Sequence, residues 1–233
     1  MSFYLKLLLI FLTLFSNVYA QEICDNGIDD DLDGLIDGFD SIDCPCGKIP
    51  IELPNSSFED FSCCPNSFSK MRCVDEWRAA SNTTSDYFNL CGYKTAAFCY
   101  PTPPVPDGNG YVGYIDGFFL DGNSYPNYKE YVGTCLLDTL RAGIDYELSF
   151  WIVNGRGDFS TTLSIYGSDD SLNQPFGDGS QNFGCPLNDT NWYLLGESKL
   201  LVSRSSWQRK TIKFTPSQDA ISLVIGPNCK LAT

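Results

Sequence analysis

The sequence predicts an all-β domain built as an antiparallel sandwich, and two observations support this class. Short runs of branched and aromatic residues recur along the chain, separated by turn-forming segments such as DGNG, GDGS and GPN. No segment carries a sustained helical period, and strands do not alternate with helices as a parallel sheet requires. A chain of this kind buries its apolar residues between two layers of antiparallel strands.

Four strands are predicted from local composition and from alternation of apolar with polar residues. They span 146–153, 161–166, 207–214 and 221–225. Within them Phe150, Trp151 and Trp207 are large apolar residues, and we predict that all three lie in the core. Residues 56–107 lack such regularity, so we expect long loops there that are held by disulfides.

Residues 1–20 form a predicted signal peptide. Lys6 stands near the start, the apolar run LLLIFLTLF follows, and the small residue Ala20 precedes Gln21. The apolar run is shorter than the roughly 20 residues that span a bilayer, and no later segment approaches that length. The sequence therefore predicts a secreted protein without a membrane span.

An Asp-rich stretch follows the signal, between Cys24 and Cys44. Counting from Asp29, acidic residues recur on alternate positions, and Gly34 at the sixth position permits a sharp turn. This is the spacing of a twelve-residue loop in which carboxylates and one backbone carbonyl surround a calcium ion. The predicted ligands are Asp29, Asp31, Asp33, the carbonyl of Leu35, Asp37 and Asp40.

Two features separate this loop from a helix–loop–helix calcium sensor. Asp40 stands where such sensors have a longer, bidentate Glu, and no amphipathic helix flanks the loop. Residues 21–48 are therefore predicted to be a fixed extracellular calcium motif, closed by Cys24 and Cys44 or by Cys24 and Cys46, with the sandwich at 49–233. The alternative is an acidic, solvated linker.

The eleven cysteines of this exported chain indicate disulfides. Adjacent Cys63 and Cys64 must take different partners. The candidates nearby in the sequence are Cys73, Cys91 and Cys99. Because the number of cysteines is odd, one thiol is free, or it pairs with another chain, or its partner lies beyond Thr233.

The net charge of −14 narrows the range of partners. An acidic surface without a basic cluster repels nucleic acid and anionic lipid, and it favours divalent cations and neutral ligands. The chain has no histidine, which excludes a Ser-His-Asp triad, a Cys-His pair and histidine-ligated zinc.

Several segments in order carry a family resemblance: PNSSFED, DEWRAASNTTSDYFNLCG, VPDGNGYVGY, YKEYVGTCLLDTLRAGIDYELSFWI and SSWQRKTIKFTP. Together they resemble the jelly-roll, galactose-binding-like domain of secreted surface proteins from gliding Bacteroidota. The segment CDNGIDDDLDGLIDGFD resembles a metal-binding motif found beside such domains. The resemblance implies a jelly-roll sandwich, type IX secretion, a surface role in adhesion or gliding motility, and a structural calcium at Glu59. It also implies one closing strand that this chain lacks.

Jelly-roll modules of this shape often bind sugars on exposed aromatic rings, which stack against pyranose faces. The candidate ligand-binding residues are Trp77, Tyr87, Tyr111 and Tyr114, which lie in or beside predicted loops. The favoured function is a non-enzymatic, calcium-stabilised extracellular adhesion module whose partner is a glycan or another cell-surface component.

Two other functions are weighed against adhesion. The sandwich is alternatively a carbohydrate-binding module that targets an appended hydrolase to polysaccharide. It is, thirdly, a hydrolase that uses two carboxylates, although no spacing singles out a pair. The carboxylates available for that chemistry include Asp75, Glu76, Asp116 and Glu130.

Overall fold

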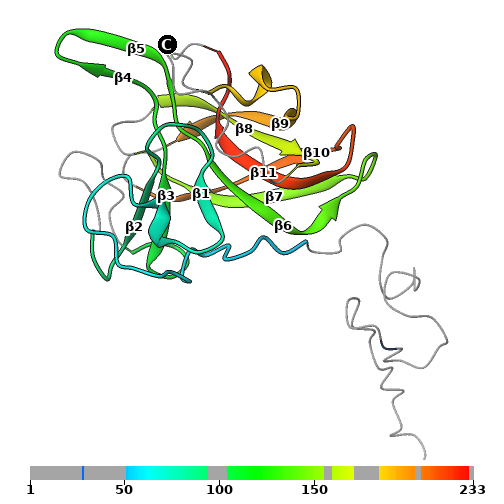
Figure 1. The fold of residues 1–233 in the computed structure, drawn as a ribbon, viewed down its shortest axis with the longest axis horizontal. Coiled ribbons are helices and arrows are strands. Elements are labelled where there is room, and N and C mark those ends of the chain that lie inside the picture. Colours follow the sequence, from blue (N-terminus) through cyan, green and yellow to red (C-terminus); the bar gives the residue numbers. More distant parts are fainter. Residues whose placement is uncertain are drawn as a thin grey trace, which may run out of the picture. The chain divides into compact units, whose positions relative to one another are not determined.

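The structure, a computed structural model, describes residue 28 and residues 51–93, 104–154, 159–170, 184–202 and 206–230. The chain divides into two compact units, Met1–Pro50 and Ile51–Thr233. Of the first unit only Ile28 is described, and its side chain is exposed. The fold given below is that of the second unit (Figure 1).

The described residues form antiparallel strands and two single-turn 3-10 helices, η2 (Met71–Cys73) and η3 (Pro186–Asn188). The strands are β1 (Trp77–Ala79), β2 (Asp86–Asn89), β3 (Gly110–Gly113), β4 (Asp116–Leu120), β5 (Asn123–Lys129), β6 (Val132–Leu140), β7 (Tyr146–Ile152), β8 (Phe159–Ser168), β9 (Tyr193–Val202), β10 (Gln208–Phe214) and β11 (Ala220–Pro227). The predicted all-β, antiparallel class is therefore confirmed. No helix in this part of the chain is long and apolar enough to cross a membrane.

A five-stranded sheet in the order β1-β6-β11-β8-β9 forms one layer of the sandwich. Its central strand β11 pairs with β6 and β8, so that Val224 lies between Gly133 and Tyr166. The second layer is the pair β7–β10, which is in register along its whole length from Ile152↔Gln208 to Tyr146↔Phe214. Figure 1 shows β7 and β10 running across the five-stranded sheet.

The main core lies between these two layers. Ile165 on β8 and Leu223 on β11 meet Ile212 and Phe214 on β10, and all four are buried. A Cβ added at Gly196 on β9 would lie 3.0 Å from the Cβ of Phe214, so the two layers approach closely there. Burial of each such side chain contributes about 1.5–3 kcal/mol to the stability of the domain.

The other face of the five-stranded sheet is covered as well. Tyr166 and Val224 alternate with the core-facing residues of β8 and β11, and they pack against Tyr131, Trp192 and Ala80. A separate cluster joins Trp77, Tyr87, Met71, Val74 and Val132 where the irregular region meets β6. The sheet is therefore buried on both sides around its centre.

Two hairpins, β2–β3 and β4–β5, pair only within themselves among the described residues. The turn between β4 and β5 is made by Asp121 and Gly122, which both have positive φ (49° and 81°). Two such residues form the tight turn that matches the twist of paired strands. Figure 1 shows this hairpin extending away from the sheets.

Among the described residues, three disulfides pin the loops of the unit. Cys63 pairs with Cys73 and Cys64 pairs with Cys91, which confirms that the adjacent cysteines take different partners and that disulfides hold the irregular region. A third bond joins Cys185 to Cys229, linking the segment before β9 to the segment after β11. Among the described cysteines, Cys135 on β6 is a free thiol.

All four strands predicted from local pattern are confirmed. The ranges 161–166 and 221–225 lie within β8 and β11, and 146–153 and 207–214 each extend one residue beyond β7 and β10. The prediction that Trp151 lies in the core is wrong, because its side chain is 48% exposed. Leu148, Phe150 and Ile152 pack on the main core, and the two-residue period of a strand then turns Trp151 to the opposite face. Trp207 is half-buried and packs edge-on against Tyr111.

Leu223→Ala should lower the free energy of unfolding by about 2–5 kcal/mol, because it removes a side chain that is 2% exposed in the middle of the main core. The matched control is Leu201→Ala on β9, where the side chain is 70% exposed and the expected change is within roughly 0.5 kcal/mol. Urea unfolding of both variants measures the difference. Equal losses in the two variants would contradict this placement of the core.

Candidate functional site

The predicted calcium loop lies outside the described residues. This applies to Asp29, Asp31, Asp33, Leu35, Asp37, Asp40, Cys24 and Cys44. The calcium site therefore stays a prediction from sequence. Within the part of the chain that the structure describes, no group of three or more His, Cys, Asp or Glu side chains is placed to hold a metal ion.

The predicted ligand-binding aromatics are packed into the body of the domain. The exposed fractions are 5% for Trp77, 0% for Tyr87 and 8% for Tyr111, and Tyr114 is half-buried against the main core. Trp77 and Tyr87 share one apolar cluster, whereas Tyr111 stacks on Phe88 with a centroid distance of 5.0 Å. The structure does not bring the four rings together on an open surface, and their role in ligand binding stays a prediction.

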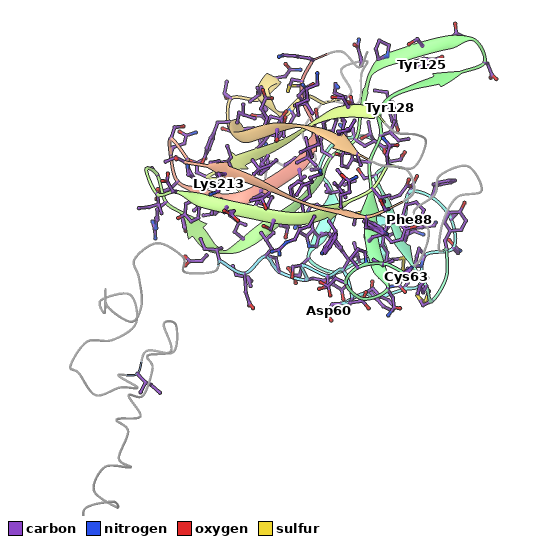
Figure 2. The ribbon with its side chains drawn as sticks, turned by 180° about the vertical axis from the view of Figure 1, so that it is seen from behind. Asp60, Cys63, Phe88, Tyr125, Tyr128 and Lys213 are labelled. Atoms are coloured by element: carbon purple, nitrogen blue, oxygen red, sulfur yellow. A yellow bond between two sulfur atoms is a disulfide. The ribbon has the colours of Figure 1, made fainter. Side chains whose placement is uncertain are left out.

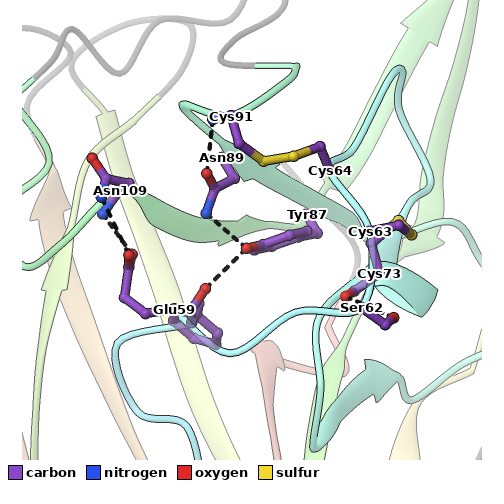
Figure 3. Close-up of a disulfide and its surroundings, with 10 residues drawn as sticks. Glu59, Ser62, Cys63, Cys64, Cys73, Tyr87, Asn89, Cys91 and Asn109 are labelled. Carbon is purple, nitrogen blue, oxygen red and sulfur yellow. Dashed lines mark hydrogen bonds between the residues drawn. A yellow bond between two sulfur atoms is a disulfide. The ribbon is translucent and has the colours of Figure 1, made fainter.

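Tyr87 has a structural role that is visible in its hydrogen bonds (Figure 3). Its hydroxyl donates to the carbonyl of Phe58 at 2.9 Å and accepts from Nδ2 of Asn89 at 2.9 Å. The side-chain oxygen of Asn89 in turn accepts from the backbone N–H of Cys91. These bonds tie strand β2 to the loop before η2, which contains Phe58 and Glu59, and to the Cys64–Cys91 disulfide.

Glu59 joins the same loop to strand β3. Its Oε1 accepts from the backbone N–H groups of Asn109 (2.5 Å) and Gly110 (2.6 Å), and its Oε2 accepts from Nδ2 of Asn109 (3.3 Å; Figure 3). A Cβ at Gly110 would lie 2.3 Å from the carbonyl oxygen of Phe58, so the approach requires glycine. Asp107, which accepts from the hydroxyl of Ser57, lines a neighbouring open depression. Calcium binding by Glu59 stays a prediction.

Glu130 is the most deeply buried carboxylate among the described residues, with 1% of its surface exposed. Its Oε1 accepts from the hydroxyl of Tyr128 (3.0 Å) and from the hydroxyl and N–H of Thr84 (3.1 and 3.3 Å), and its Oε2 accepts from the N–H of Ile115 (3.0 Å). Burial, together with the charge of Asp86, raises the pKa of Glu130 to about 7. The carboxyl joins three segments of chain.

The other carboxylates considered for hydrolysis lie in different surroundings. Asp116 forms an ion pair with Lys129, whose side chain is only 4% exposed, at the base of the β4–β5 hairpin. Asp75 and Glu76 are exposed at the start of β1. Glu130 and Asp116 thus hold the fold at its hairpin, while Asp75 and Glu76 face solvent.

The outer face of the β7–β10 pair carries exposed, complementary side chains on two regular strands. Three cross-strand pairs form it: Trp151↔Arg209, Ser149↔Thr211 and Glu147↔Lys213. All six residues are exposed. The hydroxyls of Ser149 and Thr211 are 2.9 Å apart, and Nζ of Lys213 lies 3.5 Å from Oε2 of Glu147. Figure 2 labels Lys213 on this pair of strands.

Two groups on this outer face are available for a ligand. The ring of Trp151 makes no ring contact with another aromatic among the described residues, and Arg209 forms no ion pair within the same part of the chain. The sequence contained the signal that places Trp151 outward, because Leu148, Phe150 and Ile152 occupy the opposite phase. Arg209 is found only from the strand register.

Comparison with known proteins finds similarity among solved structures alone. No protein-family model and no curated protein sequence matches the chain. Among solved structures, the chain is similar to the K1 cleaved adhesin domain of Lys-gingipain from Porphyromonas gingivalis W83. The sequence identity is 16% and the TM-score is 0.33, over 66% of this chain and 81% of that chain.

Glu130→Gln should change how stability depends on pH. The folded-state pKa is raised from the usual 4.5 to about 7, so the folded protein holds this proton after the unfolded chain has released it. The contribution of Glu130 is therefore fully present below pH 4.5 and is lost as the pH rises through about 7. Gln has nearly the same shape as Glu and does not ionise. The free energy of unfolding of the variant, relative to that of the parent, should therefore rise between pH 5 and pH 8.

Urea unfolding of both proteins at a series of pH values measures this effect. Asp86, whose pKa burial raises to about 6, titrates in both proteins. Because its charge acts on Glu130, the difference between the two profiles includes this interaction. Parallel stability profiles for parent and variant would show that Glu130 does not titrate in this range.

Proposed function

We propose that the chain is a non-enzymatic, extracellular adhesion module whose sandwich binds carbohydrate and whose N-terminal Asp-rich loop binds calcium. The observation that carries the proposal is the solvent-facing outer face of β7–β10, where an exposed indole stands beside hydroxyl and charged side chains. A face of this kind suits the binding of an extended ligand.

An extracellular setting is supported by the covalent structure. Cys63–Cys73, Cys64–Cys91 and Cys185–Cys229 are structural disulfides, which persist in oxidising compartments. The predicted signal peptide leads to the same compartment. The disulfides and the predicted signal peptide therefore both favour an extracellular location.

Binding, as opposed to catalysis, is supported by how the acidic side chains are used. The carboxylate of Glu130 is enclosed by donors from the chain itself, and that of Asp116 is paired with Lys129. A general acid or base must reach the substrate, whereas these groups are occupied in holding the fold.

Carbohydrate is the ligand class favoured by the exposed side chains. A sugar ring presents an apolar C–H face and a polar hydroxyl rim, which complement an indole plane flanked by hydroxyl and charged groups. Trp151, Ser149 and Thr211 supply this combination on one surface. A Trp side chain that stays exposed forgoes the stabilisation that burial would give. The position of Trp151 outside the core is therefore consistent with a binding role.

The calcium part of the proposal is tested by the double variant Asp31→Asn, Asp33→Asn. Calorimetric titration of the secreted chain should show saturable calcium binding at about one equivalent, with magnesium as the control ion. The variant should lose most of this binding, because two carboxylates no longer contribute charge, while the sandwich keeps its unfolding midpoint. Equal calcium affinity in parent and variant would contradict the assignment of the loop.

The adhesion part is tested by screening the labelled secreted chain on an array of immobilised polysaccharides in calcium buffer. Retention on at least one glycan is expected, and it should disappear when the disulfides are reduced and the chain is unfolded in urea. A folded chain that is retained on no glycan would overturn the carbohydrate-binding function.

A further inference from the structure

We infer that the outer face of β7–β10 is a binding site for an acidic glycan, in which Trp151 stacks against a uronic acid ring and Arg209 pairs with its carboxylate. This inference rests on the carbohydrate-binding function proposed above and adds the location of the site and the class of sugar. Three observations carry it: the fixed outward position of Trp151, the charge of Arg209, which has no acidic partner among the described residues, and the composition of the adjoining pairs.

The position of Trp151 is set by the core on the other side of β7. Leu148, Phe150 and Ile152 pack on the main core, so β7 cannot rotate without exposing them. The indole is thereby held outward on a strand that is paired along its whole length with β10. A ligand that stacks on this ring meets a preorganised surface, which lowers the entropy cost of binding.

Arg209 is placed to act on the same ligand. It lies directly opposite Trp151 in the register, and residues so paired have Cβ atoms about 4.5–5.5 Å apart. The other cation of this face, Lys213, is 3.5 Å from Glu147, so that pair is close to neutral. Among the described residues Arg209 has no acidic partner, which leaves one uncompensated positive charge beside the indole.

The neighbouring pair extends the site along the strands. Ser149 and Thr211 lie two residues from Trp151 and Arg209, which is roughly 7 Å along a strand. Their hydroxyls are able to donate to and accept from the ring hydroxyls of an adjoining sugar. Glu147 is roughly 13 Å from Trp151 by the same spacing and is engaged by Lys213.

A carboxylate is the anion that fits a single arginine. The planar guanidinium forms two parallel hydrogen bonds with a carboxylate, which adds geometric selection to charge. Nucleic acid would need several cations along its phosphates. Within the described part of the chain, this face offers one cation without an acidic partner. The net charge of −14 does not prevent binding, because charges beyond a Debye length of about 8 Å are largely screened at physiological ionic strength.

The test is calorimetric titration of the secreted chain with oligomers of galacturonic acid and with the same oligomers after their carboxyl groups have been reduced to alcohols. The buffer is calcium-free, so that no calcium ion bridges the oligomer to acidic side chains. The acidic oligomer should bind more tightly than the neutral one by roughly tenfold, and this preference should shrink as salt is added.

Two variants locate the site. Trp151→Ala should weaken binding of both oligomers by at least about tenfold, because the stacking surface is lost. Arg209→Gln should weaken binding of the acidic oligomer alone and remove the preference for it. The matched controls are Leu201→Ala and Lys199→Gln on β9, which remove an exposed apolar side chain and an exposed cation from another strand. Both controls should keep the parent's affinity within about twofold.

Each possible negative result contradicts a different part of the proposal. Binding that survives both Trp151→Ala and Arg209→Gln would overturn this site while leaving the carbohydrate-binding function in place. Binding that Trp151→Ala abolishes but Arg209→Gln leaves unchanged would overturn the acidic class of ligand. Retention of the folded parent on no glycan of the array, with no heat from either oligomer, would overturn the proposed function itself.

Discussion

The apolar interface between the five-stranded sheet and the β7–β10 pair is the constraint on which the rest of the structure depends. Leu223 and Ile165 from one layer and Ile212 and Phe214 from the other exclude water from the centre of the domain. Once these side chains face inward, the two-residue period of a strand decides which residues face solvent. The exposed Trp151 on β7 is thus a direct consequence of packing on the opposite side of the same strand.

Local pattern was sufficient to predict the all-β class and the strands β7, β8, β10 and β11, because these segments are rich in branched and aromatic residues or alternate clearly between apolar and polar residues. It did not predict β6 or β9, whose sequences VGTCLLDTL and YLLGESKLLV lack clean alternation, since parts of this sheet are buried on both faces or bulged. The candidate site was harder to predict. The outward position of Trp151 could have been read from the alternation with Leu148, Phe150 and Ile152. Its neighbour Arg209 follows only from the register of two strands far apart in sequence.

In this molecule the local arrangement of charged side chains is a better guide to ligand binding than the net charge of the chain. The net charge of −14 favours neutral ligands, yet the outer face of β7–β10 carries an unpaired cation among the described residues. Conversely, Glu130 is a buried carboxylate with a raised pKa, a property often associated with catalysis, although its donors from Thr84 and Ile115 give it a structural role. Assigning function to an ionisable group here requires its partners as well as its pKa.

The most direct measurement of the central claim is quenching of tryptophan fluorescence by acrylamide, with and without saturating galacturonic acid oligomer. Of the four tryptophans, Trp77 and Trp192 are buried and Trp207 is half-buried, so Trp151 should account for most of the accessible emission. The account predicts that the bound oligomer shields this indole and that the accessible fraction falls. An accessible fraction that stays unchanged when the oligomer is bound would contradict it.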